Sequence, residues 1–202
     1  MRSMGLRLEA AQQRRLLDYL ALLYKWNRAF NLTAVRDPAR AVSRQLLDSL
    51  SILPLVEGPR VVDLGSGAGL PGIPLAIARP GWHFALVDAN LKKSRFLRQA
   101  RMELALENVE VVRQRAEHFR PATPFRSITS RAFASLGEML AVSRHLLEPG
   151  GRWVAMKGRL PREELAALPA ELTTEVVPLR VPGEPAARHA VVIREKGRPP
   201  LS

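Results

Sequence analysis

Glycine recurs at every second position in one short stretch of the chain, between an acidic residue and a proline. The stretch runs Asp63-Leu64-Gly65-Ser66-Gly67-Ala68-Gly69-Leu70-Pro71-Gly72. Because glycine has no side chain, a ligand can lie against the backbone here, and the amides of a following helix can bind an anionic group. The residue types and their spacing indicate a nucleotide-type pocket.

Two cofactors are compatible with this pattern. Gly67, Gly69 and Gly72 fit the dinucleotide motif G-x-G-x-x-G, and Asp88 follows at the distance expected of a ribose-binding acid. Asp63, two positions ahead of Gly65, instead suits S-adenosylmethionine, since an acid there can meet the amino-acid end of that ligand directly or through water. A merely structural tight turn is the third interpretation, and the motif by itself leaves all three open.

Short apolar runs that alternate with amphipathic segments predict the elements that position this turn. Helices are expected over residues 8–29, from Asp37-Pro38 to Leu53-Pro54, over 91–106, from a Ser135/Glu138 capping box to Pro149-Gly150, and over 162–168. The predicted strands are 60–64, 84–88, 109–113, 127–131, 153–156, 174–179 and 189–194. This order predicts an α/β fold with a doubly wound, mostly parallel sheet and an antiparallel C-terminal edge. We expect residues 1–57 to form an N-terminal helical cap, 58–196 a Rossmann-like core, and 197–202 a tail.

Polar side chains follow the predicted strands where a doubly wound sheet binds its ligand. Asp88 can accept hydrogen bonds from both ribose hydroxyls, or it can simply cap the next helix. Ala116 can offer an amide and Glu117 a carboxylate to an adenine ring. Arg131 follows the fourth strand and Lys157 the fifth, so we expect these groups to converge on one site.

The charge of the chain points to a polyanionic partner. Its formal net charge is +12, and lysine and arginine neutralise phosphates with release of counterions. We therefore expect binding to RNA. The candidate contacts are Arg14, Arg15 and Arg28 on the first helix, and Lys92, Lys93, Arg95 and Arg98 on the helix after Asp88.

Several classes of site are excluded or disfavoured. The chain has no cysteine, which excludes disulfide bonds, thiolate metal sites and a cysteine nucleophile. Its four histidines are scattered, so we predict no metal. No apolar run approaches the length of a membrane span, and the N-terminus lacks a signal-peptide core. We expect a cytoplasmic monomer without a membrane association.

Several separated motifs in this chain resemble one family, the bacterial small-subunit rRNA guanine-N7 methyltransferases. The matching motifs, in chain order, are Lys25-Trp26-Asn27 with Asn31-Leu32-Thr33, Leu47-Asp48-Ser49, residues 65–75, residues 130–134, Ala155-Met156-Lys157-Gly158 and Arg188-His189. The resemblance implies a class I methyltransferase fold and transfer of a methyl group from S-adenosylmethionine to N7 of one guanine in the decoding-region loop of 16S rRNA, free or in the small ribosomal subunit. By the same resemblance, the cofactor contacts are Gly65, Leu70, Asp88, Ala89, Asn90, Ala116, Glu117 and Arg131. One position departs from the family pattern, since Gln45 follows Arg44 where the family often has histidine.

The residues also agree with N7 chemistry on their own. Methylation at cytosine C5 normally needs a cysteine nucleophile, and the chain has no cysteine. Methylation of exocyclic amines commonly uses an Asn- or Asp-Pro-Pro-aromatic loop after the fourth strand. The corresponding residues here, Ser130-Arg131-Ala132-Phe133, do not form such a motif. Guanine N7 has a free lone pair and no proton, so the main requirement is to orient N7 toward the methyl carbon. Orientation of well-placed reactants can lower the activation barrier by roughly 7–11 kcal/mol. Phe133 is a candidate for stacking on the base, unless it is plain core, and Arg131 and Lys157 are candidates for holding its O6 edge or a phosphate. An NAD(P)-dependent oxidoreductase and a non-catalytic rRNA-binding protein are the alternative functions.

Overall fold

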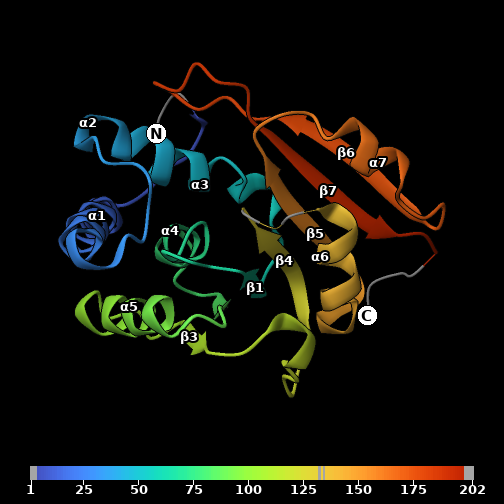
Figure 1. Cartoon of the computed structure of the whole chain (residues 1–202), viewed down its shortest axis with the longest axis horizontal. Helices are drawn as coiled ribbons and strands as arrows, with labels where there is room; N and C mark the ends of the chain where they lie inside the picture. Colours follow the sequence, from blue (N-terminus) through green and yellow to red (C-terminus); the bar gives the residue numbers. More distant parts are fainter. Residues whose placement is uncertain (1–3, 132, 134, 198–202) are drawn as a thin grey trace.

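A seven-stranded sheet forms the centre of the protein, with strand order β3-β2-β1-β4-β5-β7-β6 (Figure 1). In this computed structural model, residues 4–131, 133 and 135–197 are described. The strands are β1 Arg60–Leu64, β2 His83–Val87, β3 Val109–Val112, β4 Phe125–Ser130, β5 Leu147–Lys157, β6 Leu172–Pro178 and β7 His189–Glu195. Strands β1 to β5 pair in parallel, whereas β7 runs antiparallel to both β5 and β6. The predicted parallel sheet with an antiparallel C-terminal edge is confirmed.

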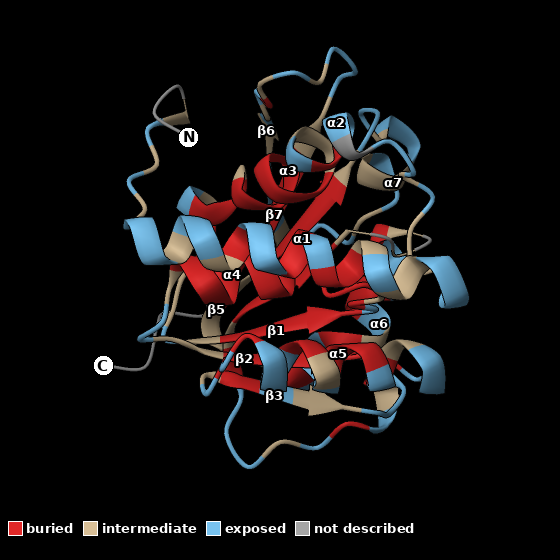
Figure 2. Cartoon of the chain, turned by 90° about the vertical axis from the view of Figure 1, so that its left-hand side faces the viewer, coloured by how far each residue is buried: buried red, intermediate tan, exposed pale blue. Residues whose placement is uncertain are grey.

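Helices cover both faces of the sheet because successive strand residues point to opposite sides. On β1, Val61 packs into one apolar cluster with α1 Ala10–Phe30, α4 Gly72–Ala78 and α5 Leu91–Glu103. Val62 and Leu64 pack into a second cluster with α6 Leu136–Ser143. Figure 2 shows α1 and α5 with exposed outer and buried inner faces on the side turned to the viewer, whereas α4 is buried along its whole length.

The N-terminal region continues from α1 through a series of short helices. They are α2 Pro38–Ala41, a π-helix Val42–Leu47, α3 Asp48–Leu50 and a 3₁₀ helix Leu53–Leu55. As expected of a helix N-cap, the Asp37 carboxylate accepts a hydrogen bond from the Ala39 amide at 2.9 Å. Leu46 and Leu50 pack into the same cluster as Val61. The proposed division into a 1–57 cap and a 58–196 core stays a prediction, although both parts bury side chains in one cluster.

Some boundaries differ from those expected. Strand β5 begins at Leu147 instead of Trp153, so Pro149 and Gly150 lie within the strand and do not end a helix. The Phe125–Leu147 pairing holds this early part of β5 against β4, across an irregular register. Helix α5 ends at Glu103, three residues early, because Ala105 adopts a left-handed φ of 48°. Of the predicted tail, residues 198–202 lie outside the described part of the chain.

A smaller helix, α7 Arg162–Ala166, lies between β5 and β6. At the start of α6, Ser135 Oγ accepts from the Glu138 amide at 3.1 Å, which is the serine half of the expected capping box. None of the helices in the described ranges combines the length and the apolarity needed to cross a membrane.

Candidate active site

The glycine turn joins the carboxyl end of β1 to α4, and its glycines have two different tasks. Gly65, Gly67 and Gly69 have φ values of 63°, 59° and 86°, which disfavour any side chain. A Cβ at Gly69 would lie 2.4 Å from Ile73 Cδ1, and one at Gly72 would lie 2.3 Å from Leu86 Cδ2. A Cβ at Gly65 would meet no atom within 4 Å. Gly69 and Gly72 thus permit close packing, whereas Gly65 leaves the backbone open on the ligand side.

Asp63 lies beneath this turn and is fully buried. Its carboxylate accepts hydrogen bonds from the Gly72 amide and from Thr129 Oγ1, both at 3.2 Å. Burial raises the pKa of Asp63 to about 7, although its hydrogen bonds act in the opposite direction. The side chain therefore ties β1 to the start of α4 and to β4. Direct or water-mediated contact between Asp63 and a cofactor stays a prediction.

Asp88 lies at the carboxyl end of β2 and faces the turn from the neighbouring strand. Its Oδ2 atom accepts from the Gly67 amide at 2.9 Å, and its Oδ1 atom accepts from the Asn90 amide at 2.8 Å. The side chain of Asn90 caps α5, because its Oδ1 accepts from the Lys92 and Lys93 amides. Asp88 is only 7% exposed, so the fold holds an oriented acceptor next to the open side of the glycine turn.

A cavity of about 310 Å³, here called the strand-end cavity, opens beside Asp88. The expected residues that line it are Gly65, Asp88, Ala89, Ala116, Glu117 and Phe133. The other expected cofactor residues, Asp63, Gly67, Leu70, Asn90 and Arg131, are not among the described residues that line it. Of these, Gly67 binds Asp88, while Leu70 is buried in the apolar cluster.

Four further residues line the strand-end cavity: Val87, Lys93, Gln114 and Arg115. Lys93 was expected to contact RNA, but its ammonium lies 3.9 Å from Asp88 Oδ2, at this cavity. Gln114 and Arg115 directly precede the expected Ala116-Glu117 pair in the segment after β3. Like Ala116 and Glu117, they follow a strand, and this position is the signal that points to them.

A second cavity, of about 490 Å³, lies against the ends of β4 and β5 and is here called the arginine cavity. Three arginines, Arg44, Arg131 and Arg188, line it together with Asp48 and Lys157. Asp48 joins two of them, since its carboxylate oxygens lie 3.8 Å from Arg131 Nη1 and 3.2 Å from Arg188 Nε. Burial raises the pKa of Asp48 despite these two cations.

The segment before β7 is attached to this cavity by further ion pairs. Arg44 Nε donates to Glu184 Oε2 at 2.6 Å, and Arg188 Nη2 lies 3.8 Å from the same oxygen. The hydrogen bond from Arg44 is the main cause that lowers the pKa of Glu184. Residues from the N-terminal helices, β4 and the β6–β7 connection therefore share one charged network.

The three candidates for positioning a guanine lie in different surroundings. Arg131 lines the arginine cavity, whereas Phe133, two positions later in the chain, lines the strand-end cavity. Lys157 also lines the arginine cavity, but its Nζ binds both Glu164 oxygens, at 3.1 and 2.9 Å. A guanine contact by Lys157 would have to share the ammonium with Glu164.

Comparison with known proteins identifies the family. The family model described as rRNA small subunit methyltransferase G matches residues 12–191. The chain belongs to this family. Proteins named ribosomal RNA small subunit methyltransferase G are 53% identical in Laribacter hongkongensis and 54% identical in Pseudomonas aeruginosa strain LESB58. These matches cover 93% and 95% of this chain, and 91% and 90% of the relatives.

Solved structures of methyltransferases share the fold of this family member. The O-methyltransferase TomG from Streptomyces achromogenes, solved in complex with SAM, superposes with a TM-score of 0.63 at 16% identity, covering 96% of this chain and 93% of its own. Cofactor-bound Rv0187 from MTB superposes with a TM-score of 0.64 at 17% identity, covering 89% and 91%. The fold is that of class I, Rossmann-like, S-adenosylmethionine-dependent methyltransferases. The family and the fold together favour the methyltransferase over the dinucleotide-dependent oxidoreductase and the non-catalytic RNA-binding protein.

Gln45, which departs from the family pattern, is held inside the protein by a hydrogen bond. Gln45 is fully buried in the π-helix, and its Nε2 donates to Thr33 Oγ1 at 3.0 Å. Its Oε1 has no hydrogen-bond partner within the described residues. Gln45 thus holds the segment after α1, which forms a wall of the arginine cavity.

The predicted RNA contacts of this methyltransferase lie on two helices that pack side by side on one face of the sheet (Figure 2). Arg14 and Arg28 on α1 are exposed, as are Lys92, Arg95 and Arg98 on α5, while Arg15 is half-buried. Across the ranges that the structure describes, no group of three or more histidine or acidic side chains is placed to hold a metal ion.

Proposed function

We propose that this protein transfers the methyl group of S-adenosylmethionine to N7 of one guanine in the decoding-region loop of 16S rRNA. Membership of the methyltransferase G family, over residues 12–191, is the observation that carries this proposal. Two cavities at the strand ends, lined by Arg131 and by Phe133 two positions later, support it, because a transferase needs one site for the cofactor and one for the acceptor. The net charge of +12 agrees with an RNA substrate.

The strand-end cavity is suited to S-adenosylmethionine. In the proposed complex, Asp88 accepts hydrogen bonds from the ribose hydroxyls, and the open backbone at Gly65 allows close approach of the ligand. Ala116 and Glu117 also line this cavity, and we place the adenine against them. When bound, the cofactor supplies an electrophilic methyl group on a sulfonium. Asp63 acts indirectly, by holding the turn between β1 and α4.

The arginine cavity is our proposed site for the acceptor guanine. Guanine N7 carries an unprotonated lone pair, so the enzyme needs no general base and contributes mainly by orientation. Arg131 can donate to the O6 edge or to a phosphate, with Asp48 holding its guanidinium in place. Phe133 lines the strand-end cavity two positions after Arg131, so we place it against the face of the base.

The identity of the methylated atom can be tested with a modified substrate. Small ribosomal subunits are reconstituted with 16S rRNA that carries 7-deazaguanine at the target position, and transfer from labelled S-adenosylmethionine is measured. This base keeps the shape and Watson–Crick edge of guanine but has carbon in place of N7. We expect binding without methyl transfer, and full transfer to matched subunits with ordinary guanine. Transfer to the 7-deazaguanine nucleotide would disprove the N7 assignment.

We place this reaction in the cytoplasm and expect the protein to act as a monomer. Light scattering at working concentrations tests this expectation, and a stable dimer would contradict it.

A further inference from the structure

A third cavity, of about 570 Å³, lies between the second half of α1, the segment after it and α2, and is here called the cap cavity. Its lining residues are Leu20, Ala21, Tyr24, Asn27, Arg28, Asn31, Arg36 and Ala41. It shares no lining residue with the strand-end or arginine cavity. Its volume is in the range of ligand-binding pockets. The cap cavity is therefore separate from the two cavities that we assign to the cofactor and the guanine.

The charge of the cap cavity is entirely positive. Arg28 and Arg36 are its charged lining residues, and both are exposed. Within the described residues neither guanidinium makes a hydrogen bond or an ion pair, whereas Arg44, Arg131 and Arg188 all face carboxylates. The acid next to Arg36, Asp37, is engaged as the N-cap of α2. Two arginines without acidic partners at one cavity favour an anionic ligand, and phosphate suits their planar donor groups.

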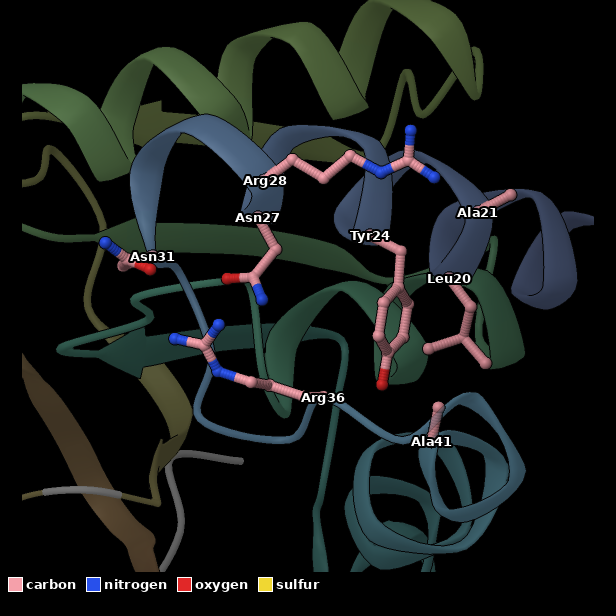
Figure 3. A pocket seen from close by; sticks show the side chains of 8 residues that line it. All are labelled: Leu20, Ala21, Tyr24, Asn27, Arg28, Asn31, Arg36 and Ala41. Atoms are coloured by element: carbon pink, nitrogen blue, oxygen red, sulfur yellow. The ribbon is translucent and has the colours of Figure 1, made fainter.

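The remaining lining residues suit a nucleoside next to that phosphate. Figure 3 shows the Tyr24 ring beside Leu20 and pointing toward Ala41, so one end of the cavity is apolar and aromatic. At the other end, Arg36 extends toward Asn27 and Asn31, whereas Arg28 extends along α1 toward Ala21, back toward the end with Tyr24 and Leu20 (Figure 3). Single-stranded RNA is commonly bound in this way, with bases on aromatic side chains, polar groups at base edges and cations at the backbone.

One chain segment separates the cap cavity from the arginine cavity. Asn31 and Arg36 line the first, whereas residues 32–35 between them line the second. Hydrogen bonds fix this shared wall: Tyr24 Oη donates to the Val35 carbonyl at 3.0 Å, and Asn27 Oδ1 accepts from the Thr33 amide at 2.8 Å. A ligand in the cap cavity is therefore a near neighbour of a guanine in the arginine cavity.

We propose that the cap cavity binds a nucleotide of the 16S rRNA strand close to the target guanine, with its backbone phosphates on Arg28 and Arg36. The shared wall then separates the anchored nucleotide from the guanine that is methylated. This inference rests on the proposed function. It adds an RNA subsite to which the N-terminal helices contribute, outside the two cavities used for chemistry.

The phosphate contacts are tested by the salt dependence of binding. Unmethylated small subunits are titrated with the double variant Arg28→Gln/Arg36→Gln in the presence of S-adenosylhomocysteine. Affinity falls as salt rises, and each lost contact to single-stranded phosphate makes the plot of log affinity against log salt less steep by about 0.7. Two lost contacts should therefore make it less steep by about 1.4. Between about 50 and 200 mM salt, the wild-type protein should lose about sevenfold more affinity than the variant.

A matched control is Arg60→Gln/Arg79→Gln, which removes the same charge at the opposite edge of the sheet. Arg60 begins β1, and Arg79 follows α4 on the way to the start of β2. The control should retain the wild-type slope. An unchanged slope in Arg28→Gln/Arg36→Gln, or an equal change in both double variants, overturns the proposal.

A cross-linking experiment tests the location directly. Since the chain has no cysteine, Ala21→Cys introduces a single thiol at the exposed lining of the cap cavity, to which an azidophenacyl group is attached. We expect photo-cross-links to nucleotides flanking the target guanine, and none there from Ala122→Cys, which is exposed in the loop before β4. If adenosine monophosphate protects the Ala21→Cys thiol but the small subunit does not, the cavity binds free nucleotides and the proposal is wrong.

The two proposals fail in different ways. If wild-type protein methylates the subunit but Ala21→Cys gives no cross-link near the target, only the cap-cavity proposal fails. If wild-type protein transfers no methyl group to 16S rRNA, the proposed function itself fails.

Discussion

Replacement of Asp88 by alanine is the most direct test of the strand-end cavity. The carboxylate accepts hydrogen bonds from the Gly67 and Asn90 amides, at 2.9 and 2.8 Å, and lines the cavity. In the proposed complex it also accepts from the ribose hydroxyls. Asp88→Ala therefore removes the partner of the glycine turn and of the ligand at the same time.

The size of both effects follows from these contacts. Leaving donors at a largely buried site without an acceptor costs about 1–3 kcal/mol. We expect the affinity for S-adenosylmethionine to fall by this amount, which corresponds to roughly 5- to 150-fold. The free energy of unfolding should also fall, by up to a similar amount, because the Gly67 and Asn90 amides lose their acceptor. Both hydrogen bonds are only partly buried, so water can replace part of what is lost.

Calorimetric titration with S-adenosylmethionine measures the affinity, and a thermal melt shows that the variant is folded. Asp37→Ala is the matched control, since Asp37 also caps a backbone amide, at Ala39, but does not line the strand-end cavity. The control should lose stability only. If folded Asp88→Ala binds S-adenosylmethionine as tightly as the wild-type protein, the ribose assignment is wrong.

Three further outcomes are expected. Arg95→Gln/Arg98→Gln on the exposed face of α5 should flatten the salt dependence of RNA binding without changing cofactor affinity in calorimetry; an unaltered slope would move the RNA surface off α5. Gly69→Ala should lower the free energy of unfolding by about 1–3 kcal/mol, because its Cβ would overlap the Ile73 side chain; a denaturant titration without such a loss would contradict the packing. Burial raises the folded-state pKa of Asp63 to about 7, above its unfolded value, so the folded state binds the extra proton. Stability should therefore fall as pH rises from about 4 to about 7, and Asp63→Asn should reduce this fall; equal pH profiles for the two proteins would contradict the shift.

The sequence alone was sufficient for the fold and for the convergence of several strand-end residues on one cavity. Strand β1 was predicted with its correct bounds, because a short apolar run stopped by glycines is a local signal. Gly65, Asp88, Ala116 and Glu117 were expected at one site, and all four line the strand-end cavity. The physical reason is topological: the carboxyl ends of parallel strands meet at one edge, so residues placed after each strand converge.

The tertiary structure decided which polar groups are already engaged. Nothing local reveals that Asp63 lies fully buried between Gly72 and Thr129, or that Lys157 binds Glu164. The start of β5 at Leu147 was also missed, because the Pro149-Gly150 pair is a local signal for a helix end, whereas pairing with β4 is not local.

The proposed RNA sites depend even more on long-range packing. Asp48, Arg131 and Arg188 lie far apart in the chain, and only the approach of three elements brings them into one ion-pair network. Arg28 was an expected RNA contact because of its charge, whereas Arg36 was not, since a basic residue in a connecting segment carries no periodic signal. Periodicity and motif spacing determine which residues lie at strand ends and on helix faces. The cavities between those elements, and the charges left without partners in them, are fixed only when the helices pack on the sheet.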